Sequence, residues 1–265
     1  MHAPRISASS YSNTAPLVWS FLYGKNHGKV EMILDTAPSR SAELLAQDRV
    51  DAALVPVIAY QTIGNVRLIP DVCVGAKERV RSVCLVTNGR DLTDVGSVAL
   101  DTSSQTSVAL TKIIFREFLG SEPVWKDASP DIDAMLAASD AALLIGDPAL
   151  RLSALPAGAA YRTFDLAELW RQHTGFGFVF AMWMTSRKDV AIDFAAARDE
   201  GLEHIEEIIA NYETEITLGH DEMRQYLSEN ISYSVSDSMQ RGMELYFELA
   251  QKNGLLTENK PLEFI

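Results

Sequence analysis

Short apolar runs with the composition of β-strands alternate with amphipathic helical runs along most of this chain. The strand-like runs include "RISAS", "KVEMILD", "VDAALVP", "SVALD" and "AALLIG". Helical runs begin near residues 14, 38 and 104, each shortly after such a strand. In this order each helix returns the chain to the start of the next parallel strand. The alternation therefore predicts an α/β protein with largely parallel sheets.

The alternation falls into two sets, followed by a helical tail. The first set ends where "VRLIP", "VCVGA" and "VRSVCLVT" follow one another without a helix, and the second runs from "SVALD" to "FVFAMWMTS". After residue 186 apolar residues recur at helical spacing. We expect two crossings, near residues 87–91 and 185–189. The sequence thus predicts two lobes with a cleft, residues 1–88 plus 187–265 in the first and 89–186 in the second.

Composition excludes several classes of function. The formal net charge of −13 over 265 residues, without a basic stripe, argues against a nucleic-acid partner. The histidines show no metal-ligand spacing and the glycines form no nucleotide-phosphate loop, so no metal is expected. Cys73 and Cys84 lie in apolar strand-like surroundings, and we expect reduced, buried thiols.

The longest apolar runs, such as "FGFVFAMWM", are about half of the ~20 residues that a membrane helix needs. The first residues lack the basic, apolar and small-residue pattern of a signal peptide. We therefore expect a soluble, cytoplasmic protein without a membrane partner.

The stretch "ALDTSSQTSVALTKIIF" is unusually polar where a predicted strand meets a predicted helix. The strand ends near Asp101 and the helix begins near Ser104, so backbone N–H groups and hydroxyls converge at one helix N-terminus. Such an end attracts carboxylates and phosphates without Lys or Arg. An ordinary helix cap is the alternative for any single hydroxyl. With so many polar side chains at the joint, we favour an anion site, formed by Thr102, Ser103, Ser104, Gln105 and Thr106.

Two other joints are candidates for the same cleft. Asn13 follows the first strand and opens the first helix, where capping is the alternative role. In "LLIGDPAL", Gly146 permits close approach of a ligand. Asp147 either caps the helix that starts at Pro148 or orients a ligand hydroxyl.

Three further side chains are weaker candidates. Arg81, on a strand that leads to the first crossing, could pair with a ligand carboxylate or lie on the surface. Phe176 could be a pocket wall, although a core position is the default for an aromatic residue. His173 could act as a base, but a histidine at a helix end is more often on the surface.

Six segments together resemble one known family in the same order over most of residues 5–186. They are "ISASSYSNTAPL", "VDAALVPVIAY", "VRSVCLVT", "VALDTSSQTSVAL", "LLIGDPAL" and "DLAELWRQHTGFGFVFAMW". The sequence is similar to the chorismate dehydratases of the futalosine route to menaquinone. The resemblance implies the two-lobed fold of type 2 periplasmic solute-binding proteins. It also implies removal of water from chorismate, without a cofactor, to give 3-[(1-carboxyvinyl)oxy]benzoate.

The resemblance gives the candidate residues roles. Asn13 would hydrogen-bond the departing hydroxyl or the enolpyruvyl carboxylate, with support from Ser82. The residues of the polar joint, with Arg81 and Phe176, would bind the dianionic substrate, and Asp147 would orient its ring hydroxyl. Two positions depart from the expected pattern, Ser12 in place of an apolar residue and Val57 in place of a small polar one.

Other readings stay open at this point. A dihydroxynaphthoate synthase of the same route, a transport solute-binding protein and the effector domain of a transcription regulator would share the fold. "SYSNTAPL" resembles the dehydratase motif more than the "CPND"-type motif of the synthase. The tail helices would pack on the first lobe, which we favour, or form the face of a homodimer.

Overall fold

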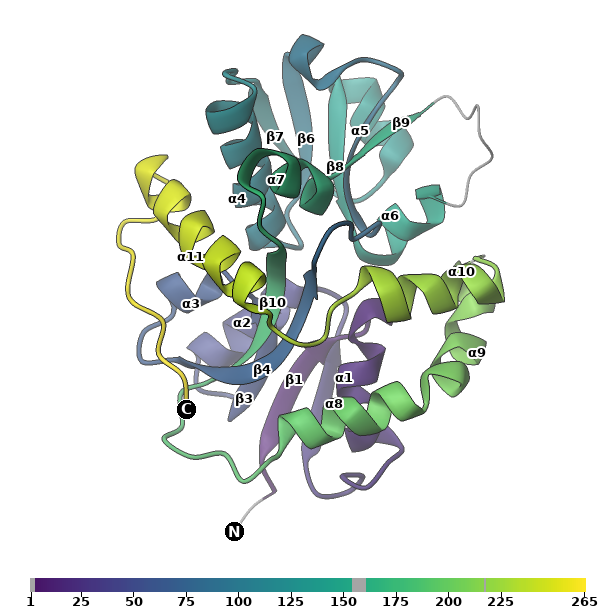
Figure 1. Cartoon of the computed structure of the whole chain (residues 1–265), viewed down its shortest axis with the longest axis vertical. Helices are drawn as coiled ribbons and strands as arrows, with labels where there is room; N and C mark the ends of the chain where they lie inside the picture. The colour runs from purple at the N-terminus through teal and green to yellow at the C-terminus, as the bar shows by residue number, and fades with distance from the viewer. Residues whose placement is uncertain (1–2, 154–160, 217) are drawn as a thin grey trace.

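Two five-stranded sheets, one in each lobe, organise the computed structural model, which describes residues 3–153, 161–216 and 218–265 (Figure 1). The first sheet has the order β2-β1-β3-β10-β4. Its strands are β1 (Arg5–Ser9), β2 (Glu31–Asp35), β3 (Ala52–Pro56), β4 (Arg67–Ala76) and β10 (Phe178–Thr185). Strands β1, β2 and β3 are parallel, and β10 is antiparallel to both β3 and β4.

The second sheet has the order β7-β6-β8-β5-β9. Its strands are β5 (Val83–Thr87), β6 (Ser97–Asp101), β7 (Val124–Ala128), β8 (Ala141–Ile145) and β9 (Arg162–Asp165). Strands β6, β7 and β8 are parallel, whereas β5 is antiparallel to β8 and β9. Each lobe thus combines three parallel strands with an antiparallel pair, which confirms the α/β class.

Helices connect the parallel strands in both lobes. In the first lobe a 3₁₀ turn (Ser12–Thr14) leads into α1 (Ala15–Leu22), followed by α2 (Pro38–Ala46) and α3 (Ala59–Thr62). In the second lobe α4 (Gln105–Ile113) continues as a π-helical turn (Ile114–Phe118). The others are α5 (Ile132–Ala138), α6 (Gly146–Ser153) and α7 (Leu166–Thr174), and a 3₁₀ turn spans Leu92–Asp94.

The chain crosses between the lobes earlier than the sequence suggests. One crossing lies between β4 and β5, at residues 77–82, and the other between α7 and β10, at residues 175–177. The expected lobe boundaries placed β5 in the first lobe and β10 in the second, and sheet membership reverses both assignments. The reason is that antiparallel pairing with strands distant in the sequence determines which sheet β5 and β10 join. Their local sequence does not indicate this pairing.

The two crossings lie against each other. An ideal Cβ at Gly177 would be 2.9 Å from the carbonyl oxygen of Ala76 and 2.7 Å from the side chain of Met239. Only glycine fits between the crossing backbones and the C-terminal helix at this position.

The C-terminal helices attach to both lobes. They are α8 (Phe194–Glu203), α9 (Ile205–Ile216), α10 (His220–Gln225) with a following π-helical turn (Tyr226–Asn230), and α11 (Asp237–Lys252). Helix α8 packs on α1 of the first lobe, as expected. Helix α11 lies where the two lobes meet (Figure 1), and its Tyr246 hydroxyl donates to the carbonyl of Thr106 in the second lobe at 3.1 Å.

Both cysteines are free and buried, in agreement with the sequence prediction. Burial raises the pKa of the Cys84 thiol to about 12 and that of Cys73 further. These thiols therefore stay protonated and act as small apolar core residues. Within the described ranges, no helix combines the length and the apolar character that crossing a bilayer requires.

Candidate functional site

The carboxyl ends of strands from both sheets face one another across a small cavity. Strands β1 and β3 end at its first-lobe side, and β8 ends at its second-lobe side. In open α/β sheets, ligands bind at such strand ends. The wall consists of Ser9, Tyr11, Asn13, Pro38, Pro56, Val74, Val83, Ser104, Ser107, Ile145, Gly146, Phe180 and Ala181.

The lobes are in contact around this cavity. The backbone N–H of Ile58 donates to the Thr106 hydroxyl oxygen at 3.2 Å, and the N–H of Ser39 donates to the Ser103 carbonyl at 3.2 Å. The volume of this cavity is about 50 Å³, well below the roughly 300 Å³ at which small-molecule pockets begin. A ligand of that class therefore enters only when the lobes move apart.

Asp147 forms the best-defined contact between the lobes. Its carboxylate accepts from the Ser12 hydroxyl at 2.6 Å and from the Ser12 backbone N–H at 3.2 Å. Burial raises the pKa of Asp147, and the Ser12 hydrogen bonds oppose this rise. These hydrogen bonds join Asp147 to the opposite lobe, and its orientation of a ligand hydroxyl stays a prediction. Ser12, the departure from the expected motif, is thus the partner of a site carboxylate.

Gly146, next to Asp147, makes this approach possible. Its φ is +63°, and an ideal Cβ would be 2.9 Å from the ring of Tyr11 in the first lobe. A side chain at this position would hold the lobes apart as well as strain the backbone.

Asn13 comes from the first lobe and Ser82 from the first crossing, and both are hydrogen-bonding neighbours of the Tyr226 hydroxyl. The Asn13 side chain lines the cavity and is 8% exposed. Its carboxamide is a hydrogen-bonding neighbour of the Tyr226 hydroxyl, although the geometry is not that of an ordinary hydrogen bond. Ser82 is fully buried, its hydroxyl is 3.5 Å from the Val80 carbonyl, and its own carbonyl accepts from the Gly146 N–H at 2.7 Å.

Tyr226 completes this group, and sequence reasoning did not find it. Its side chain is fully buried, and Ser82 and Asn13 are near enough to its hydroxyl to influence the tyrosine pKa as hydrogen-bonding groups. Burial is the larger effect and raises that pKa well above its usual value. Tyr226 lies in an amphipathic helical run, where a tyrosine is indistinguishable from an ordinary core residue.

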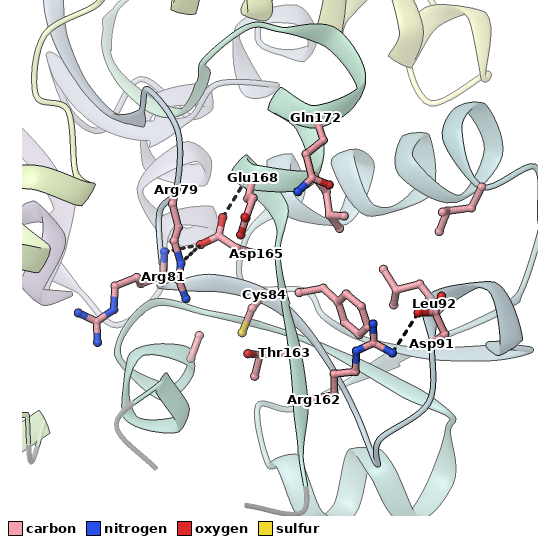
Figure 2. Close-up of a pocket in the computed structure, with 14 residues that line it drawn as sticks. Arg79, Arg81, Cys84, Asp91, Leu92, Arg162, Thr163, Asp165, Glu168 and Gln172 are labelled. Atoms are coloured by element: carbon pink, nitrogen blue, oxygen red, sulfur yellow. Dashed lines mark hydrogen bonds and ion pairs between the residues drawn. The ribbon is translucent and has the colours of Figure 1, made fainter. Parts of the chain in front are cut away.

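A second pocket, of about 370 Å³, lies within the second lobe (Figure 2). Most of its charged groups are already paired. Arg162 is 3.0 Å from Asp91, Arg79 is 3.8 Å from Asp165, and Asp165 accepts from backbone N–H groups that include that of Arg81 at 2.6 Å. Because most of these charges are paired and the wall comes from the second lobe and the crossing residues Arg79 and Arg81, without the first lobe, the cavity between the lobes is the better candidate site.

The family follows from comparison of the whole chain with known proteins. A family model described as menaquinone biosynthesis matches residues 4–252. The chain belongs to this menaquinone biosynthesis family. A chorismate dehydratase of Thermus thermophilus is 31% identical over 257 residues, which is 90% of this chain and 92% of that protein.

Solved structures show the fold of this family member. A protein of Archaeoglobus fulgidus has a TM-score of 0.71 at 16% identity and covers 96% of this chain and 98% of its own. The periplasmic aliphatic sulphonate binding protein of Escherichia coli has a TM-score of 0.66 at 17% identity, covering 100% and 96% respectively. The predicted two-lobed, periplasmic-binding-protein-like fold is confirmed.

The residues of the polar joint, 102–106, lie partly at the contact between the lobes and partly on the surface. Ser104 and Thr106 are buried at the contact between the lobes, and the Ser104 hydroxyl caps α4 by accepting from the Ser107 N–H at 3.3 Å. Thr102 and Gln105 are exposed and line a separate surface pocket of about 380 Å³. Ser103 is half-buried, and its hydroxyl donates to Asp101 at 2.5 Å.

Three weaker candidates lie away from the cavity. The Arg81 guanidinium is 3.7 Å from the Glu222 carboxylate, and the residue has a φ of +63°. Phe176 is half-buried, with the Arg241 guanidinium 4.7 Å from its ring centroid. His173 is exposed and stacks on Phe118. A different aromatic residue, Phe180, lines the cavity instead.

Among residues 3–153, 161–216 and 218–265, no three His, Cys, Asp or Glu side chains are grouped as metal ligands would be.

Replacing Asp147 with asparagine is expected to change how stability depends on pH. Burial raises the folded-state pKa of Asp147 above its value of 3.8 in a free side chain. The protonated acid is therefore favoured in the fold, and that contribution is present below about pH 4 and lost as the pH rises through the raised pKa. Asparagine does not titrate. The melting temperature of Asp147→Asn relative to wild type should accordingly rise between about pH 4 and pH 7.

Thermal unfolding across that range measures the difference. Asp221→Asn, at an exposed position of α10, serves as the control and should show a nearly constant difference. A difference for Asp147→Asn that stays flat or falls with increasing pH would contradict the burial of an ionisable group at this contact.

Proposed function

We propose that this member of the menaquinone biosynthesis family is a chorismate dehydratase, a hydro-lyase that converts chorismate to 3-[(1-carboxyvinyl)oxy]benzoate and water. The observation that carries the proposal is the 31% identity, over 90% of the chain, with the chorismate dehydratase of Thermus thermophilus. The position of the cavity between two lobes supports it, because such a cleft encloses a small molecule completely.

The reaction needs little chemical assistance but strict control. The ring C–O bond to the hydroxyl and the C–H bond on the neighbouring ring carbon break, water leaves and the ring becomes aromatic. Chorismate can also rearrange or lose its enolpyruvyl group. An enclosed site that fixes one conformer selects among these outcomes, and positioning with preorganised dipoles supplies most of the acceleration.

An acidic protein can hold this dianion through dipoles instead of cationic side chains. The N-terminus of α4, with Ser104 and Thr106, presents N–H groups and hydroxyls at the contact between the lobes. One substrate carboxylate would bind there. Asn13 and Ser82 would hydrogen-bond the departing hydroxyl or the enolpyruvyl carboxylate. Asp147, released from Ser12 as the lobes part, would orient the ring hydroxyl on closure.

The proton acceptor in this proposal is the substrate itself. Tyr11 is the one ionisable side chain in the described cavity wall, and burial raises its pKa, so it stays protonated near neutral pH. Asp147 is not part of that wall and is assigned to the ring hydroxyl. A protonated phenol cannot accept the ring proton. The enolpyruvyl group is joined through its ether oxygen to the ring carbon that loses the proton. Its carboxylate would take this proton once closure has excluded water.

Incubation of the purified protein with chorismate tests the proposal. Liquid chromatography with mass detection should show catalytic formation of a product that has lost one water and retains the enolpyruvyl ether. Chorismate that is bound but returned unchanged would instead favour a solute-binding protein. Chorismate that is neither bound nor changed would favour another enzyme of this family.

A further inference from the structure

The hydroxyl of Tyr226 is a buried polar group without an ordinary partner. The side chain has no exposed surface, and no hydrogen bond of normal geometry reaches its oxygen from any residue in the described ranges. Folded proteins rarely leave a buried hydroxyl in this condition, because desolvation is costly. Other buried polar atoms of the described residues share this condition, and the Tyr226 hydroxyl differs from that of Tyr233 in having the candidate site residues Asn13 and Ser82 as hydrogen-bonding neighbours.

The segment that begins at Tyr226 leads to a strand of the cavity wall. It begins the π-helical turn Tyr226–Asn230, which the Ile231 N–H closes by donating to the Tyr226 carbonyl at 3.1 Å. Such turns are rare and occur often at functional sites. The chain then pairs with β4 through two hydrogen bonds between Gly75 and Ser232, of 2.8 and 3.0 Å. Gly75 follows Val74, a residue of the cavity wall.

The groups near the Tyr226 hydroxyl are the two expected to act on the substrate. Ser82 and Asn13 both influence its pKa as hydrogen-bonding neighbours, although neither is aligned for a normal hydrogen bond while the lobes enclose only about 50 Å³. A bound substrate enlarges this space and requires these side chains to adjust. The same adjustment can align Tyr226 with them.

The charge of the proposed substrate fixes the direction of the hydrogen bonds. A carboxylate or a departing hydroxyl needs a donor, so the Nδ2 group of Asn13 must face the substrate. The amide oxygen, Oδ1, then faces the protein and needs a donor of its own. A tyrosine hydroxyl that stays protonated is such a donor, and Ser82 can donate to the tyrosine oxygen in turn.

We infer that Tyr226 is a positioning residue, which donates a hydrogen bond to Oδ1 of Asn13 in the substrate complex and so presents Nδ2 to the substrate. This role rests on the proposed function, since it requires an anionic ligand beside Asn13. Tyr226 acts through Asn13 and does not itself line the cavity. The helical tail thereby contributes to the site as well as to the first lobe.

Tyr226→Phe removes the hydroxyl and keeps the ring. It should lower kcat for chorismate about 10-fold while KM changes less than about twofold, because the lost contact aligns a group that acts on the reacting atoms. Tyr233→Phe is the matched control. Its hydroxyl is also buried and without an ordinary partner in the described ranges, but neither Asn13 nor Ser82 is among the groups that influence its pKa. It should leave kcat within about twofold of wild type.

A double-mutant cycle with Asn13→Ala separates positioning from a structural effect. If Tyr226 acts through Asn13, then Tyr226→Phe should lower kcat less than about twofold in the Asn13→Ala background. An equal loss in both backgrounds, or a similar loss in Tyr233→Phe, would overturn the role.

The same experiments distinguish a failure of the proposed function from a failure of the role of Tyr226. If wild-type protein binds chorismate without converting it, that function fails, and the same cycle is measured on the dissociation constant of chorismate by calorimetry. Coupling between the two substitutions then supports the contact, and additivity overturns it. Wild-type protein that neither binds nor converts chorismate overturns both proposals.

Discussion

Replacing Asn13 with alanine is expected to lower kcat for chorismate dehydration about 100-fold. Asn13 lines the cavity and is 8% exposed, so its donor can reach a substrate bound there. Removal of one preorganised donor from a water-excluded site typically costs 10²–10³ in kcat. A 100-fold loss corresponds to about 2.7 kcal/mol of transition-state stabilisation. Steady-state kinetics with chorismate measures it.

The fold should tolerate Asn13→Ala well. The 3₁₀ turn that holds Asn13 is fastened by Thr14, whose hydroxyl donates to the Ser9 carbonyl at 2.6 Å and to the Tyr11 carbonyl at 2.8 Å. The melting temperature should therefore change by less than about 3 °C. Asn26→Ala is a control with the opposite expected result. Nδ2 of Asn26 donates to the Ser20 hydroxyl at 2.9 Å, and neither residue lines the cavity. This substitution should affect stability and spare turnover. Wild-type kcat in Asn13→Ala would exclude the proposed role.

Residues that the sequence could identify lie where strands end and helices begin. Asn13, Ser104, Thr106 and Asp147 each follow a buried apolar strand, and parallel strands bring their carboxyl ends together whatever their order in the sheet. The local pattern was therefore enough to predict that these side chains approach the cleft. It could not predict that Asp147 binds Ser12, because that contact joins residues 135 positions apart.

Other features depend on geometry that the sequence does not record. Within the joint after β6, the first turn of α4 directs neighbouring residues to different faces, so that Thr106 is buried while Thr102 and Gln105 are exposed. The lobe boundaries depended on the antiparallel pairing of β5 and β10, which long-range contacts decide. Tyr226 carried no signal at all, since its neighbours form an amphipathic helical pattern typical of packing.

Gly201→Ala is expected to destabilise the protein by about 3 kcal/mol. Gly201 lies in α8, and an ideal Cβ there would be 1.9 Å from the Pro16 carbonyl oxygen and 2.7 Å from its carbon in α1. Alanine is the better helix former by ~1 kcal/mol, but it fits only if the two helices separate. The free-energy cost of this overpacking exceeds the gain in helix propensity. The melting temperature should fall by roughly 10 °C.

The consequence of this substitution should extend to the site, because α1 begins two residues after Asn13. Displacement of α1 by α8 would shift the turn that carries the Asn13 carboxamide, so kcat should fall together with stability. Gly64→Ala is the matched control, since no atom lies within 4 Å of its ideal Cβ, and it should change the melting temperature by less than about 2 °C. An unaltered melting temperature in Gly201→Ala would mean that α1 and α8 part without cost, and the tail would then be a loose attachment. A large fall would instead make the tail part of the support for the catalytic cleft, in agreement with the position of Tyr226.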